Sequence, residues 1–229
     1  MAGTRYFTRS SFAFLNDLAD NNNRDWFNAN KDRYENDLRG PALQFIADFA
    51  PHLKKISPHF RSDPRPSGGS MFRIYRDTRF SKDKSPYKTY TGLQFRHDRG
   101  KDAHCPGFYL HLEPGQFFVG VGIWHPDGPT TRSIRDAIVE DPTAWKRASR
   151  GKKFAGLFDM EGDRLKRPPK GYDPEHALIE DLKRKDFIGV TKVTQKTITS
   201  PDFMKEFTDL CRTGVPYMKF LCKALDVPF

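Results

Sequence analysis

The stretch that decides the fold is GFYLHLEPGQFFVGVGIW, from Gly107 to Trp124, which holds two alternating segments on either side of a turn sequence. The turn is Glu113-Pro114-Gly115-Gln116, with proline second and glycine third, as β-turns favour. Pairing across Pro114-Gly115 sets Leu112 opposite Phe117, Leu110 opposite Val119 and Phe108 opposite Val121. The sequence therefore predicts an antiparallel hairpin with one wholly apolar face toward the core.

The other face of this hairpin contains most of the predicted pocket residues. Two glycines in mid-strand leave a floor without side chains, and aromatic rings with a histidine surround it. One interpretation is a helix packed tightly across Gly120 and Gly122, and the other is a pocket for a flat or sugar-like group. A bulge at the turn would reverse the assignment of faces. The pocket prediction comprises Tyr75, Tyr109, His111, Phe118, Gly120, Gly122 and Trp124.

A second unusual stretch lies before the hairpin: RIYRDTRFSKDKSPYKTY, Arg73 to Tyr90, called here the basic-aromatic block. It holds six Arg or Lys, two Asp and four aromatic residues. The alternation that begins at Met71 predicts a strand that continues into a loop. Guanidinium groups bind phosphate and carboxylate with two parallel hydrogen bonds, so the block is a candidate anion site. The residues predicted to bind an anion are Arg73, Arg76, Arg79, Lys82, Lys84 and Lys88, together with Arg132 further along the chain.

The same block also fits a purely architectural role. On a strand, Arg76 would share the apolar face of Phe72 and Ile74, where an unpaired charge is costly. A carboxylate partner would make the block a network of ion pairs, and the candidate partners are Asp77, Asp83 and Glu113. Two aspartates against six cations leave a surplus of positive charge, which tips the balance slightly toward an anion site.

Arg132 enters the prediction through its position at a helix start. Thr131 is expected to cap a helix over Arg132–Glu140, which places Arg132 and Arg135 in its first turn. Cations there oppose the helix dipole, and a bound anion would reverse that cost. The alternative is that both side chains reach away into solvent.

Composition and patterning set the fold class. The chain has 229 residues, of which 37% are hydrophobic and 14% aromatic, enough for a real core. We expect a single α+β domain over 1–229 with a mostly antiparallel sheet flanked by helices. Residues 1–60 are expected to be helical, with Gly40-Pro41 between two helices, and 70–125 to form the sheet core. Residues 130–229 should add helices, one of them from Asp173 to Lys185, and one strand over Phe187–Val193.

Charge, cysteine content and hydropathy bear on partners and location. The formal net charge is +10, which favours anionic partners such as nucleic acid or phosphorylated metabolites. The three cysteines are widely spaced and odd in number, which argues against a disulfide framework. No segment is long and apolar enough to span a membrane, so we expect a cytoplasmic protein without a membrane partner.

Four blocks of the sequence together resemble a known family. NNNRDWFNANKDRYE, FRIYRDTRFSKDKSPYKT, GFYLHLEPG and VGVGIW are similar to the signature blocks of a widespread bacterial and fungal family of conserved hypothetical proteins, catalogued as a domain of unknown function (family 2461). The resemblance covers nearly the whole chain. It implies one domain and supplies no activity, cofactor or catalytic residue.

Three functions follow from the residues. The first is binding of an anionic small molecule or nucleic acid through the basic-aromatic block. The second is an enzyme acting on a small anionic substrate over the Gly120/Gly122 face, and the third is a non-catalytic scaffold. Five His or Cys side chains between His97 and His125 match no zinc signature, so no metal and no cofactor are predicted.

Overall fold

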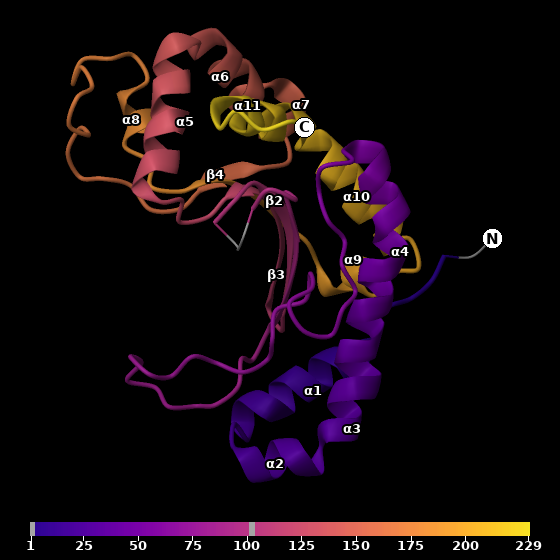
Figure 1. Ribbon diagram of the computed structural model, residues 1–229. Helices are drawn as coiled ribbons and strands as arrows, with labels where there is room; N and C mark the ends of the chain where they lie inside the picture. Colours follow the sequence, from indigo (N-terminus) through magenta and orange to yellow (C-terminus); the bar gives the residue numbers. More distant parts are fainter. Residues whose placement is uncertain (1–2, 101–103) are drawn as a thin grey trace.

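The structure, a computed structural model, describes residues 3–100 and 104–229 (Figure 1). Within them a five-stranded antiparallel sheet has the order β1-β2-β3-β5-β4, and helices pack around it, so the predicted α+β class is confirmed. The strands are β1 Thr91–Arg96, β2 Gly107–Glu113, β3 Gln116–Ile123, β4 Asp159–Glu161 and β5 Phe187–Lys192.

The hairpin forms in the predicted register. Leu112 pairs with Phe117, Leu110 with Val119 and Phe108 with Val121. Gly115 has a φ of +82°, the left-handed value that the third position of this turn requires of glycine. β5 is also as expected and β1 lies within the predicted sheet core, whereas β4 escaped prediction because three residues are too short to show a period.

The N-terminal helices pack on the convex face of the sheet. They are α1 Arg9–Asp20, α2 Arg24–Ala29, α3 Lys31–Arg33, the π-helical η1 Tyr34–Arg39 and α4 Gly40–Ile56. The prediction that Gly40-Pro41 separates two helices is wrong, because the chain passes from η1 directly into α4 with Pro41 in its first turn. Phe12 of α1 contacts Phe117 with ring centroids 4.8 Å apart, and Phe49 of α4 contacts Phe95 at 4.7 Å.

The later helices cover one end of the sheet and complete its convex side (Figure 1). They are α5 Gly128–Glu140, α6 Pro142–Arg150, α7 Lys152–Ala155, α8 Ile179–Leu182, α9 Gln195–Ile198, α10 Phe203–Thr213 and α11 Val215–Ala224. The predicted helix from Asp173 to Lys185 is reduced to α8, since turns occupy the residues before it. Phe203 and Phe207 of α10 pack against Phe45 of α4, both with centroids 5.4 Å from it, and so close the core behind the hairpin.

The segment after Met71 is not a regular strand. It makes only isolated bridges, Met71 with Leu93 and Tyr75 with Tyr87, and then continues as the basic-aromatic block. The amide side chain of Asn22 holds this block from the N-terminal region: its Nδ2 donates to the Tyr87 carbonyl at 2.9 Å and its Oδ1 accepts from the Tyr87 N–H at 3.0 Å.

No helix among residues 3–100 and 104–229 combines the length and the apolar character needed to cross a bilayer.

Candidate functional site

A cavity of about 620 Å³ lies on the concave face of the sheet. Figure 1 shows this face between the end that carries α5 and α8 and the end that carries the basic-aromatic block. Tyr75, also predicted for the pocket, lies outside the cavity lining and is exposed beside Phe27 and Tyr87. The remaining predicted pocket residues all line the cavity: Tyr109, His111, Phe118, Gly120, Gly122 and Trp124.

The two mid-strand glycines differ in whether a side chain would fit. Gly122 has a φ of +126°, and a Cβ there would lie 2.0 Å from the Phe187 carbonyl oxygen of β5. At Gly120 an added Cβ would meet only Tyr109, at 3.6 and 3.9 Å, which is ordinary contact. A neighbouring strand therefore leaves no room for a side chain at Gly122, whereas a Cβ at Gly120 would make only ordinary contact with Tyr109. No helix of the described chain packs across the two glycines in the way that one interpretation expected. Gly120 is the floor of the cavity.

Three side chains on β2 form a continuous hydrogen-bonded chain along the cavity. His111 Nε2 lies 2.9 Å from Glu113 Oε2, and His111 Nδ1 lies 3.0 Å from the Tyr109 hydroxyl oxygen. An ionised carboxylate only accepts, so Nε2 carries the hydrogen and Nδ1 of the neutral ring accepts from Tyr109. Burial lowers the pKa of His111, against a smaller opposite effect of Glu113, and burial raises the pKa of Tyr109. The ring is therefore held neutral in one tautomer.

Aromatic rings fix the position of His111 in this chain. Tyr90 lies on one side with centroids 4.7 Å apart, and Phe118 stacks at 4.6 Å with an interplanar angle of 12°. Gly92 of β1 leaves room for the phenol of Tyr109, since a Cβ there would lie 2.4 Å from the Tyr109 hydroxyl oxygen. The hydrogen-bonded chain is therefore held in place by packing and depends on a glycine from the neighbouring strand.

The basic-aromatic block neutralises part of its own charge. Arg76 pairs with Asp83, and Arg79 pairs with Asp77 at 2.7 Å. Arg79 holds the pKa of Asp77 at about 2, and Arg76, with help from Ser85, lowers the pKa of Asp83. Both aspartates of the block are used in this way. These pairs are largely exposed and contribute little to stability.

The other cations of the block differ in what surrounds them. Lys84 donates from Nζ to the Thr78 carbonyl at 2.9 Å, and Arg73 and Lys82 are exposed. Lys88 alone is half-buried, with its Nζ 5.5 Å from the ring centroid of Phe72 and 5.8 Å from that of Tyr90.

Lys88 connects the block to the cavity, because both rings that it contacts also line that cavity. Burial and then the charge of Arg73 lower the pKa of Lys88. Within the described residues no carboxylate pairs with Lys88 or with Arg73. Lys88 therefore lies beside the cavity at the end where the block meets it, and Arg73 is close enough to lower its pKa.

Arg132 belongs to a different part of the molecule. The helix α5 begins at Gly128 with Asp127 as its N-cap, so the prediction that Thr131 caps it and that Arg132 and Arg135 fill its first turn is wrong. The Asp127 carboxylate accepts from the Thr130 N–H at 2.8 Å and supplies the negative charge expected of an anion. Arg132 lines a separate open cleft and is not brought together with the basic-aromatic block.

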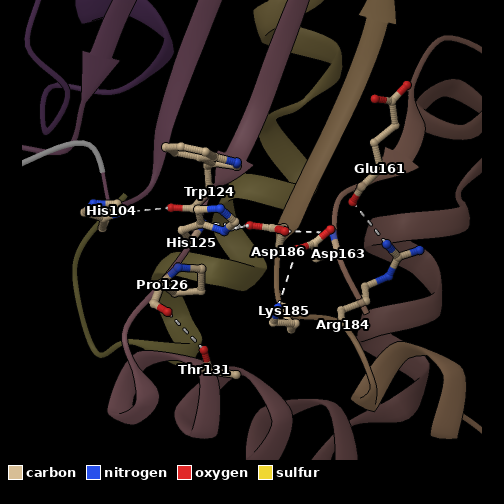
Figure 2. A network of polar contacts seen from close by, with 10 residues as sticks. All are labelled: His104, Trp124, His125, Pro126, Thr131, Glu161, Asp163, Arg184, Lys185 and Asp186. Atoms are coloured by element: carbon tan, nitrogen blue, oxygen red, sulfur yellow. Dashed lines mark hydrogen bonds and ion pairs between the residues drawn. The ribbon is translucent and has the colours of Figure 1, made fainter. Parts of the chain in front are cut away.

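Three features of the site were not foreseen. Glu113 was assigned to the turn, although its place two residues after His111 on one strand face was a usable signal. Lys192 and Ile188 of β5 line the cavity and became visible only through strand pairing. His125 hydrogen-bonds Asp186, 61 residues away, at the edge of the cavity near Trp124 (Figure 2).

A comparison with known protein families identifies the family to which the chain belongs. Residues 10–220 match the family described as "Conserved hypothetical protein (DUF2461)", so the chain belongs to this family, as the sequence blocks indicated. No curated protein matches the chain.

Proposed function

We propose that the concave face binds a small anionic molecule that contains a flat ring. The observation that carries this proposal is the uncovered cavity over Gly120, with aromatic side chains around it. Its volume of about 620 Å³ lies within the range of ~300–1,000 Å³ that small-molecule sites occupy. A ring placed on Gly120 meets no side chain from below and lies beside Tyr109 and Phe118.

In this proposal the anionic group of the ligand lies at the end of the cavity next to the basic-aromatic block. Lys88 is half-buried without a carboxylate partner, so a ligand anion would supply the missing counter-charge. Arg73 adds a second charge beside it. The Tyr109 hydroxyl donates to His111 and leaves its own oxygen lone pairs for a hydrogen-bond donor on the ligand.

The experiment is isothermal titration calorimetry with adenosine monophosphate, with adenosine as the ring without the anion and inorganic phosphate as the anion without the ring. Gly120→Leu fills the floor, and Lys88→Met removes the charge while keeping the aliphatic stem. We expect each change to weaken binding of the monophosphate by about ten-fold or more, equivalent to roughly 1.4 kcal/mol. Lys84→Met is the matched control, because this lysine bonds to a loop carbonyl.

Two outcomes contradict this proposal. One is that none of the three probes binds, and the other is that binding is indifferent to Gly120→Leu. Binding of single-stranded DNA that depends on the fully exposed Phe80 and not on Gly120 would support nucleic-acid recognition by the block in place of a small ligand.

A proton-transfer enzyme is the second candidate, and the Tyr109–His111–Glu113 chain favours it. In such an enzyme Tyr109 accepts a proton from the ligand as it passes its own to His111, and Glu113 stabilises the imidazolium. Tyr109→Phe then abolishes turnover while ligand binding persists, which separates this function from binding alone.

A further inference from the structure

A second polar network lies where β3 ends, and its centre is Asp186 (Figure 2). This side chain is 1% exposed and accepts two backbone hydrogen bonds. Its Oδ1 accepts from the His125 N–H at 2.7 Å, and its Oδ2 accepts from the Asp163 N–H at 2.8 Å. The His125 ring makes an ion-pair contact with the same carboxylate, with Nδ1 2.8 Å from Oδ1. The buried carboxylate is thus held by two backbone amides and lies against one histidine ring.

The backbone makes room for this carboxylate at two places. Gly162 has a φ of +98°, and a Cβ there would lie 2.4 Å from the Asp186 Cβ. His125 itself has a φ of +46°, a left-handed conformation that few residues other than glycine adopt. Strained residues of this kind persist only where surrounding contacts hold them, and they cluster at functional sites.

The contact with Asp186 bears on the chemistry of the His125 ring. A carboxylate oxygen accepts hydrogen bonds, so this contact favours the tautomer with the hydrogen on Nδ1 and the lone pair on Nε2. The His125 side chain is 46% exposed, so the ring can meet a substrate in solvent. A carboxylate behind an exposed imidazole is the arrangement that orients a general base in hydrolytic enzymes.

The neighbour of this ring is an exposed aromatic surface. Trp124 stacks on His125 with centroids 4.2 Å apart, is 52% exposed and lines the edge of the cavity. His104 approaches the same indole at 6.1 Å, and its Nδ1 lies 3.1 Å from the Trp124 carbonyl oxygen. A flat ring on a substrate therefore has a stacking partner directly beside the imidazole.

We infer that His125 and Asp186 form a hydrolytic dyad for esters whose ring rests on Trp124. Nε2 of His125 takes a proton from water as the water oxygen bonds to the acyl carbon. The bond from that carbon to the leaving oxygen breaks, and the imidazolium returns the proton to the leaving oxygen. The products are the acid and the alcohol or phenol, and Asp186 acts as a positioning residue that holds Nδ1–H throughout.

The test is hydrolysis of p-nitrophenyl acetate, which combines an ester with a flat ring, followed by the absorbance of p-nitrophenolate. His125→Asn is the informative variant, because asparagine tolerates positive φ and keeps the backbone bond to Asp186. We expect its rate to fall by about 100-fold, the lower end of what general acid–base catalysis contributes. His176→Asn is the matched control and retains the rate, because this histidine lies in a loop away from Trp124 and the cavity. Trp124→Leu raises KM more than it lowers kcat.

Gly120→Leu separates this inference from the proposed ligand site: it removes ligand binding in the cavity and leaves ester hydrolysis intact. A His125→Asn variant that hydrolyses the ester as fast as the unmodified protein overturns the dyad. The tautomer gives an independent check by ¹⁵N NMR, where His125 should carry its hydrogen on Nδ1 and Asp186→Asn should shift it toward Nε2. A wild-type ring protonated on Nε2 alone overturns the dyad even if Asp186→Asn fails to fold.

Discussion

The two faces of the β2–β3 hairpin come from the same eighteen residues and have opposite environments. On the convex face Leu110 and Val119 are fully buried beneath helices. On the concave face His111, Phe118 and Gly120 line a cavity that no described helix covers. Because strand side chains alternate, every second residue belongs to the core and the residues between them belong to the site. Along each strand of the hairpin, residues that pack into the core therefore alternate with residues that line the cavity.

The largest expected effect contrasts one residue from each face. Leu110→Ala leaves a cavity in a close-packed core and should lower the free energy of unfolding by about 2–5 kcal/mol. Phe118→Ala removes more atoms from a partly exposed ring, and we expect it to cost less than Leu110→Ala while it weakens ligand binding. Urea denaturation of both variants measures the difference. A greater loss of stability for Phe118→Ala would show that both faces are core.

A sharper comparison uses the two glycines, which are two residues apart on β3. Gly122→Ala forces a side chain into a left-handed conformation and against the Phe187 carbonyl, so we expect a loss of at least about 1–3 kcal/mol. Gly120→Ala meets only Tyr109 at contact distance and should be neutral, or stabilising by up to about 1 kcal/mol, because glycine weakens a strand interior. Thermal unfolding of the two variants measures this. Equal losses would contradict the open floor at Gly120.

The smallest expected effect is a pH dependence that arises on the concave face. Burial lowers the pKa of His111 in the folded protein, so the unfolded chain takes up a proton at higher pH than the folded chain does. The stability that neutral His111 contributes is complete above the unfolded pKa of ~6.5 and is lost as pH falls toward the folded pKa. Between pH 7 and 5 the Tm of the wild-type protein should therefore fall more than that of His111→Gln.

Differential scanning fluorimetry over this pH range measures the difference, with His176→Gln as the control, because this histidine lies in a loop away from the cavity. Parallel Tm curves for the wild-type protein and His111→Gln would show that the His111 ring keeps its ordinary proton affinity in the folded state.

Local signals were enough to predict the hairpin. Proline and glycine at fixed turn positions set the loop length, and the loop length set the register of every pair along β2 and β3. The pocket residues on the concave face followed from that register alone. β5 could also be predicted from a local signal, because it is a short and largely apolar segment.

Other parts of the fold depend on contacts that no local pattern contains. The helix α5 starts at Gly128 because the carboxylate of its N-cap, Asp127, accepts from the Thr130 N–H, although Asp127-Gly128-Pro129 looks like a turn. The expected strand after Met71 is interrupted because its amides bond to scattered carbonyls, such as Arg76 N–H to Pro86 O. The pairing of His125 with Asp186 joins residues 61 positions apart and left no mark in the spacing of either.

The amide of Asn22 has a consequence for the order of folding. Its two hydrogen bonds to Tyr87 close a loop of 65 residues between the turn after α1 and the end of the basic-aromatic block. Closing such a loop costs chain entropy, so this contact forms only after the segments on either side have docked. We therefore expect the block to acquire its shape late, and local unfolding of the N-terminal helices to release it together with Lys88, the residue after Tyr87.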